Sequence, residues 1–140
     1  MKRKGYTLVE LLATIVILAI IALIAVPIVL NIINDAKESS LLRSAEFYLD
    51  AVEFSIANTV LYDSGISNGN FPITKEGNIC MDILSSGSCS GEILTVEVNG
   101  DKPTGGSITI DSGNIADVEI ELNERTIVKN SKGELVYLKY

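Results

Sequence analysis

The sequence has 140 residues, a formal net charge of −7 and no histidine. This length accommodates one small domain with one additional segment, but not two hydrophobic cores. Without histidine, Ser-His-Asp and Cys-His nucleophile systems are excluded, and only carboxylates and thiols remain as metal ligands. The acidic balance argues against direct nucleic-acid binding, because phosphate binding relies on Lys and Arg.

The N-terminal part of the chain is the most informative stretch. A leader with three basic residues ends at Gly5, and after Glu10 an apolar run extends from Leu11 to Leu30, broken only by Thr14 and Pro27. About 20 helical residues cross a hydrocarbon core about 30 Å thick, so the run is long enough to span a membrane. A secretory signal has a shorter apolar region followed by an A-x-A-like site, and this sequence fits neither criterion.

Glu10 stands at the entrance to this apolar run. A carboxylate in lipid costs about 2.5–3.5 kcal/mol at mid-depth and less near the interface. A plain anchor has no use for such a group, whereas a segment that later packs against a cationic partner does. The carboxylate therefore favours a helix that leaves lipid for a protein partner.

The spacing of Gly5, Tyr6, Glu10 and Pro27 resembles that of the type IV pilin and pseudopilin family. The resemblance covers roughly residues 1–35, with Tyr6 at a position where the family usually has Phe. It implies cleavage by prepilin peptidase between Gly5 and Tyr6, N-methylation of the new Tyr6 amine, and a helix bend at Pro27. It also implies that Glu10 neutralises the Tyr6 amine of a neighbouring subunit in a helical filament.

These interpretations divide the chain into four segments. Residues 1–5 are a leader peptide, 6–34 the transmembrane and assembly half of a helix, 35–62 its amphipathic half, and 63–140 a globular head. The positive-inside rule places the leader in the cytoplasm and residues 35–140 outside the membrane. Loss of the leader's three basic residues changes the side-chain charge from −7 to −10.

The helical pattern continues beyond the apolar run. Apolar residues recur at spacings of three and four and predict one buried stripe, formed by Leu41, Ala45, Tyr48, Leu49, Val52, Ile56 and Val60. The opposite face carries charged side chains, and the sequence 63–65 (Asp-Ser-Gly) provides a stop signal. One helix from Tyr6 to about residue 61 is too long for a small domain, so half of it must serve membrane or other copies of the chain.

After a Gly-, Ser- and Asn-rich surface loop at 63–78, the apolar period changes to two. Strands are predicted at 92–98, 107–110, 117–122, 126–128 and 134–138, and residues 130–133 (Asn-Ser-Lys-Gly) form a predicted hairpin turn. The expected fold is α+β: the long N-terminal helix, packed on a small antiparallel sheet of about four strands.

No stretch of the sequence indicates catalysis. There is no P-loop, dinucleotide fingerprint or EF-hand loop, and the segment Asp111–Asp117 is better explained as a polar turn than as a cation site. Glu119 and Glu121 stand two apart on the solvent face of a predicted strand, not as an acid/base pair. We therefore expect no enzyme activity, no cofactor and no metal site.

Cys80 and Cys89 enclose eight residues. Outside the cytoplasm two cysteines so placed favour a disulfide, although two free thiols remain the alternative. A bridge over so short a loop would contribute roughly 2–3 kcal/mol in the chain-entropy model.

The sequence thus predicts a structural subunit, a pilin, of a type IV pilus-like surface filament. The expected partners are further copies of the chain, prepilin peptidase, an inner-membrane assembly platform, minor pilins, and the membrane before assembly. The subunit would be a single-pass membrane protein with a cytoplasmic N-terminus before assembly and extracellular afterwards. The alternatives are a minor pseudopilin of a competence or type II secretion system, and a membrane-anchored surface binding domain in which Glu10 is accidental.

Overall fold

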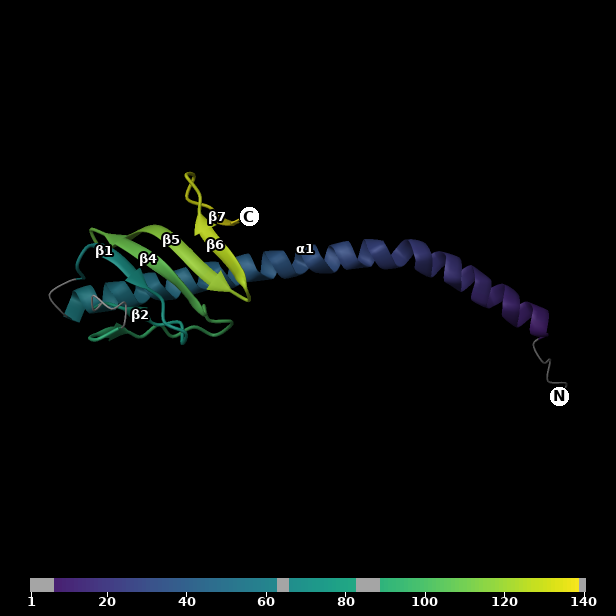
Figure 1. The fold of residues 1–140 in the computed structure, drawn as a ribbon, viewed down its shortest axis with the longest axis horizontal. Helices are drawn as coiled ribbons and strands as arrows, with labels where there is room; N and C mark the ends of the chain where they lie inside the picture. The colour runs from purple at the N-terminus through teal and green to yellow at the C-terminus, as the bar shows by residue number, and fades with distance from the viewer. Residues whose placement is uncertain (1–6, 63–65, 83–88, 139–140) are drawn as a thin grey trace. The chain divides into compact units, whose positions relative to one another are not determined.

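A computed structural model describes residues 7–62, 66–82 and 89–138. The first element is α1, a helix of 55 residues from Leu8 to Tyr62, about 80 Å long at about 1.5 Å per residue. It begins two residues after the expected start and ends close to the predicted stop. The chain forms two compact units, Met1–Ser39 and Ser40–Tyr140, and the second contains the last part of α1 and all strands (Figure 1).

The second unit contains a five-stranded antiparallel sheet in the order β1-β4-β5-β6-β7. Its strands are β1 (Gly69–Pro72), β4 (Gly105–Asp111), β5 (Asn114–Leu122), β6 (Arg125–Lys129) and β7 (Leu135–Tyr137). A separate two-stranded sheet pairs β2 (Ile79–Cys80) with β3 (Ile93–Leu94). The α+β class and the antiparallel sheet are confirmed, with five strands in the main sheet where about four were expected.

Tight turns connect the last four strands of the main sheet. Ser112 and Gly113 lie between β4 and β5, and both have positive φ, at 54° and 80°. Asn123 and Glu124 lie between β5 and β6, again with positive φ, at 49° and 64°. Two consecutive positive φ values characterise the type I′ turn, whose twist matches that of the flanking strands.

The predicted turn at residues 130–133 is confirmed as the connection between β6 and β7. Asn130 donates its N–H to the carbonyl of Glu134 at 2.8 Å, and its side-chain oxygen accepts the N–H groups of Lys132 and Glu134, both at 2.9 Å. The side chain therefore organises the turn in which Gly133 adopts a φ of 85°.

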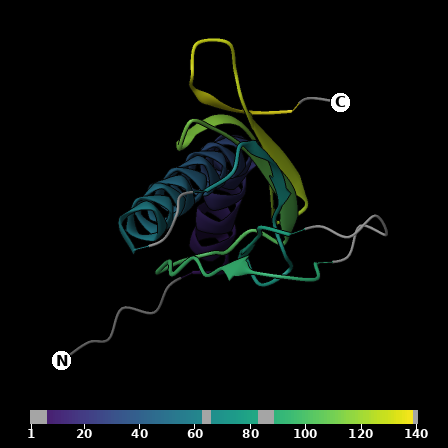
Figure 2. The same ribbon diagram turned by 90° about the vertical axis from the view of Figure 1, so that its left-hand side faces the viewer.

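The core of the second unit lies between one face of the main sheet and the last part of α1 (Figure 2). Along β5 the side chains alternate, with Val118, Ile120 and Leu122 buried and Glu119 and Glu121 exposed. The helix contributes its predicted stripe, of which Ala45, Tyr48, Val52 and Ile56 are buried. The apolar side chains of β5 and of the helix stripe are buried in the same core, and the removal of their surface from water drives the packing of the helix on the sheet.

Val60 departs from the predicted stripe, since it is 48% exposed. The core cluster along α1 ends at Ile56, so the last helical turn has no sheet residue to cover it. The stripe is therefore one turn shorter than its sequence period indicated.

Strands β1 and β2 were not predicted, and the strand predicted at 92–98 is longer than the observed β3. The segment 63–78, expected to be a loop, contains β1, and residues 63–65 lie outside the described part. The predicted strand at 92–98 is reduced to β3, because Val96 is bonded to side chains instead of to a ladder. Its N–H donates to Oδ1 of Asn78 at 3.2 Å, and its carbonyl accepts from Nζ of Lys102 at 3.3 Å.

Tyr48 is the largest fully buried side chain of the core. Its hydroxyl has no hydrogen-bond partner among the described residues. Desolvation by burial raises the pKa of this hydroxyl, because the phenolate form would be a buried charge. The ring therefore stabilises the core through its apolar area, while its hydroxyl opposes folding.

Candidate functional site

The first turn of α1 is closed by Thr7. Its carbonyl accepts the N–H groups of Glu10 and Leu11, both at 3.1 Å, and its Oγ1 accepts the N–H of Glu10 at 3.3 Å. Thr7 is thus the N-cap, and Glu10 stands at N3, the pair of positions that forms a capping box. The sequence analysis missed this role of Thr7, although the pattern Thr-x-x-Glu before an apolar run is readable in the sequence.

The cap gives Glu10 a local function in addition to the predicted one. A carboxylate in the first turn interacts favourably with the positive end of the helix dipole. Glu10 is also the one charged residue between Leu8 and Ile33. The dipole interaction and the predicted pairing role are compatible, because a carboxylate accepts several hydrogen bonds.

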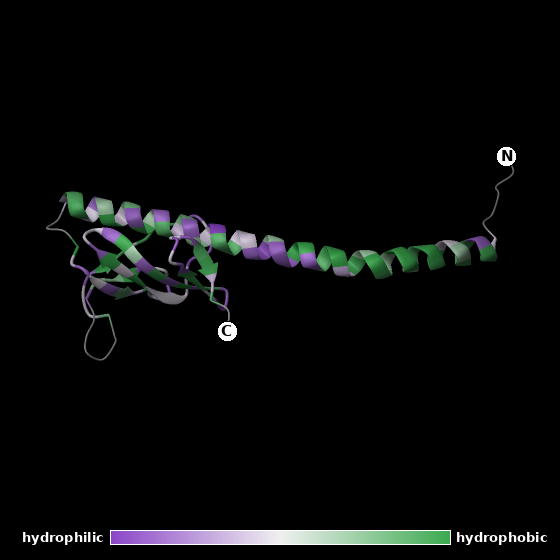
Figure 3. Cartoon of the chain, turned by 90° about the horizontal axis from the view of Figure 1, so that it is seen from above, coloured by the Kyte–Doolittle hydropathy of each residue, from purple (hydrophilic) through white to green (hydrophobic). Residues whose placement is uncertain are grey.

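The first unit has no core of its own. From Thr7 to Ser40 every residue is exposed except the half-buried Ala25, and large apolar side chains such as Leu8, Leu23 and Ile24 are 62–80% exposed. In Figure 3 most of this part of the helix is green, the colour of hydrophobic residues. The helix is long and apolar enough to cross a membrane.

Polar atoms within this run are satisfied by the helix itself. Thr14 Oγ1 donates to the carbonyl of Leu11 at 2.7 Å, so its hydroxyl needs no external partner. Pro27 lies inside α1, which continues through it without a break. The N-terminal, purple to blue part of α1 is curved in Figure 1. Gly5 and Tyr6, the predicted cleavage residues, lie outside the described residues.

The second unit has a disulfide between Cys80 and Cys89, with 5.8 Å between the Cα atoms. Cys80 is buried in β2, whereas Cys89 is exposed. The bridge predicted from the sequence is therefore present, and it attaches the segment after β2 to the small sheet.

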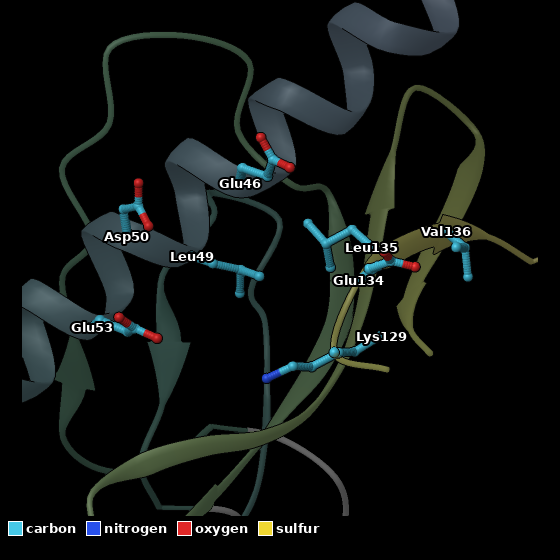
Figure 4. A pocket seen from close by; sticks show the side chains of 9 residues that line it. Glu46, Leu49, Asp50, Glu53, Lys129, Glu134, Leu135 and Val136 are labelled. Atoms are coloured by element: carbon cyan, nitrogen blue, oxygen red, sulfur yellow. The ribbon is translucent and has the colours of Figure 1, made fainter. Parts of the chain in front are cut away.

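A cleft of about 600 Å³ lies between the last part of α1 and the β6–β7 hairpin (Figure 4). The helix lines it with Glu46, Asp50 and Glu53, and the hairpin adds Glu134 and Lys129. Lys129 Nζ donates to the carbonyl of Ile115 at 3.3 Å, so its charge is tied to the sheet. The cleft is acidic, and no group of His, Cys, Asp and Glu within the described ranges could hold a metal ion.

The segment Asp111–Asp117, predicted as a polar turn, contains the two-residue β4–β5 turn, and its other residues are the end of β4 and the beginning of β5. Asp111 Oδ1 accepts hydrogen bonds from Asn68 Nδ2 at 2.8 Å and Ser112 Oγ at 3.2 Å. Its carboxylate is therefore used to attach the turn to the residue before β1. Glu119 and Glu121 point to solvent, as their alternation indicated.

An aromatic pair is exposed on the part of α1 that belongs to the second unit. Phe47 is 63% exposed and Phe54 is 68% exposed, and their spacing of seven residues places both on one face of the helix. This face differs from the buried stripe.

Comparison with known proteins gives a match at the N-terminus. Residues 1–26 match the model of the prokaryotic N-terminal methylation motif. No curated protein and no solved structure matches the chain significantly. The matched segment contains Gly5, Tyr6 and Glu10 and ends next to Pro27. The chain therefore carries, in register with its apolar helix, the class III signal motif of the type IV pilin and pseudopilin family.

Proposed function

We propose that this chain is the structural subunit of a type IV pilus-like surface filament. The methylation motif at residues 1–26 is that of a subunit processed at its N-terminus. The observation that carries the proposal is the combination of an exposed apolar helix half with one charged residue, Glu10, at its start. Lipid covers the apolar side chains before assembly, and other copies of the same helix cover them afterwards.

In this proposal the chain is cut between Gly5 and Tyr6, and the new Tyr6 amine is methylated. Glycine fits a cleavage site because it has no side chain to obstruct the protease. The amine then lies one residue before the N-cap Thr7, close to the positive end of the helix dipole, where a positive charge is unfavourable. The carboxylate of Glu10 on a neighbouring copy compensates that charge and fixes the register between the two helices.

The proposed path runs from a single-pass membrane subunit to an extracellular filament. An assembly platform extracts the helix from the membrane, and the bend predicted at Pro27 serves packing in the filament. Minor pilins would share the apolar helix and initiate the polymer. The exposed Phe47 and Phe54 support the proposal further, because they offer a second apolar contact outside the membrane.

The test separates the charge of Glu10 from the N-cap made by Thr7. Glu10→Gln removes the charge but preserves the capping box, which accepts Gln at N3. Thr7→Ala removes the cap and preserves the charge. We expect Glu10→Gln to reduce the polymer sheared from the cell surface strongly while Thr7→Ala reduces it little.

Both variants are compared by immunoblot of sheared and membrane fractions and by the mass of the N-terminal peptide. A chain that starts at methylated Tyr6 in polymeric material supports the proposal. A minor pseudopilin would give the same N-terminus in trace amounts of polymer. A chain that starts at Met1 in the membrane fraction, with no effect of Glu10→Gln, would identify a membrane-anchored surface domain and refute it.

A further inference from the structure

The chain contains two Asn-Gly sequences, Asn68-Gly69 and Asn99-Gly100. An asparagine followed by glycine is chemically labile, because the glycine has no Cβ to hinder attack of its backbone nitrogen on the asparagine side chain. The reaction requires a free side-chain amide and a free N–H on the glycine. The structure meets these requirements at one pair and not at the other.

Asn68 is held at both ends of its amide. Its Nδ2 donates to Asp111 Oδ1 at 2.8 Å, and its Oδ1 accepts the N–H of Ser112 at 2.8 Å. The following Gly69 is paired with Ile110 in the main sheet. Ring closure at Asn68 therefore requires both side-chain hydrogen bonds to break and β1 to separate from β4.

Asn99, unlike Asn68, has a side-chain amide that is not held by hydrogen bonds within the described residues. Its side chain is exposed, and within the described ranges neither its amide nor the N–H of Gly100 has a hydrogen-bond partner. Gly100 has a φ of 152°, and a Cβ placed on it would meet no atom within 4 Å. Nothing in the described chain obstructs rotation of the Asn99 side chain towards the Gly100 nitrogen.

The base of this loop is nevertheless fixed. Val96 and Pro103 are fully buried, and Lys102 Nζ donates to the carbonyl of Val96 at 3.3 Å across the loop. Asn99 shares a hollow of about 360 Å³ with Glu97 and Lys102. Asn99 is exposed, whereas the residues at the two ends of its loop are buried or hydrogen-bonded. A chemical modification of Asn99 therefore leaves the packing of the core intact.

We propose that Asn99 is a site of spontaneous modification to aspartate and isoaspartate. The backbone nitrogen of Gly100 forms a bond to Cγ of Asn99, the bond from Cγ to Nδ2 breaks, and the N–H proton leaves with the amide nitrogen as ammonia. Water then opens the succinimide at either carbonyl and gives a carboxylate, with one proton released to solvent. The product places a new negative charge between Glu97 and Asp101, in a chain whose net charge changes from −7 to −8.

The rates of modification at Asn68-Gly69 and Asn99-Gly100 can be compared within the same molecule. The full-length chain, purified in detergent, is incubated in mildly alkaline buffer made with heavy-oxygen water, and peptides are mapped by mass spectrometry. Because the Asn68 amide must first lose two hydrogen bonds, we expect its reaction to be slower than that of Asn99 by at least roughly tenfold. Incorporation of heavy oxygen identifies modification that occurs during the incubation.

Two controls isolate the structural cause. In denaturant both pairs should react at similar rates, because the chemistry of Asn-Gly is then the same at each. Asp111→Ala, which removes the acceptor for Asn68 Nδ2, should accelerate Asn68 and leave Asn99 unchanged. Equal rates at the two sites in the folded chain, or faster reaction of Asn68, would overturn the proposal.

Discussion

Tyr48→Phe is expected to stabilise the folded chain, although Tyr48 is fully buried. Desolvation of a polar group without a hydrogen-bond partner costs about 1–3 kcal/mol, and the Tyr48 hydroxyl has no partner among the described residues. Removing the oxygen leaves the ring in place and creates no large cavity. The free energy of unfolding should rise by about 1 kcal/mol or more, which corresponds to a rise in Tm of roughly 4–8 °C for a domain of about 100 residues.

The measurement is thermal unfolding of the full chain in detergent, followed by near-ultraviolet circular dichroism. Tyr62→Phe is the matched control, because Tyr62 is on the same helix and 90% exposed, so its loss should leave Tm unchanged. A lower Tm for Tyr48→Phe would refute the reasoning, since it would show that the native hydroxyl has a favourable interaction.

The same hydroxyl predicts a pH dependence. Burial raises the pKa of Tyr48 in the folded state, whereas an unfolded tyrosine titrates near about 10. Above that pH the unfolded chain loses a proton that the native chain retains, so the free energy of unfolding falls as pH rises. Below pH about 10 both states keep the Tyr48 proton, so this pH-dependent loss of stability begins only above that pH. We expect stability above this pH to fall more steeply in the wild type than in Tyr48→Phe; equal slopes would contradict the assignment.

Three further predictions concern the second unit. Reduction of the Cys80–Cys89 disulfide should lower the free energy of unfolding by roughly 2–3 kcal/mol, measured by denaturant titration with and without reductant; unchanged midpoints would argue against a stabilising bridge. Ile120→Ala, in the middle of β5, should cost about 2–5 kcal/mol in the same titration, whereas exposed Glu119→Ala should change stability by less than about 0.5 kcal/mol. Phe54→Ser should leave Tm nearly unchanged but reduce sheared polymer, and normal polymer yield would exclude this ring from the assembly contact.

Local patterns determined the parts of this fold whose side chains show a strict period. The alternation of Val118, Ile120 and Leu122 predicted β5, and the three-and-four spacing predicted the helix stripe through Ala45 and Ile56. These patterns are visible in the sequence because one face of each element is buried and the other faces water, so selection for burial repeats with the period of the element. The same reasoning failed for β1, because this strand lies in a Gly-, Ser- and Asn-rich stretch and only one of its four residues, Phe71, is buried.

The N-terminal motif is equally a property of the sequence alone. The order of Gly5, Tyr6, Glu10 and the apolar run indicated the family resemblance, and the match to the methylation motif confirms that recognition. Such a signal can be recognised locally because all of its residues lie in one continuous stretch, residues 1–26. The same stretch also contains the Thr7 cap, which could have been read from the spacing of Thr7 and Glu10.

Only the tertiary structure decided how side chains far apart in the sequence act on one another. In the tertiary structure Asn68 is hydrogen-bonded to the β4–β5 turn, whereas Asn99 has no partner among the described residues, although both are followed by glycine. The Tyr48 hydroxyl is buried with no partner in the same described ranges, and Val96 is bonded to Asn78 and Lys102 instead of to a strand ladder. The physical reason is that hydrogen bonds and desolvation depend on which atoms folding brings within about 3 Å, and no local period encodes that distance.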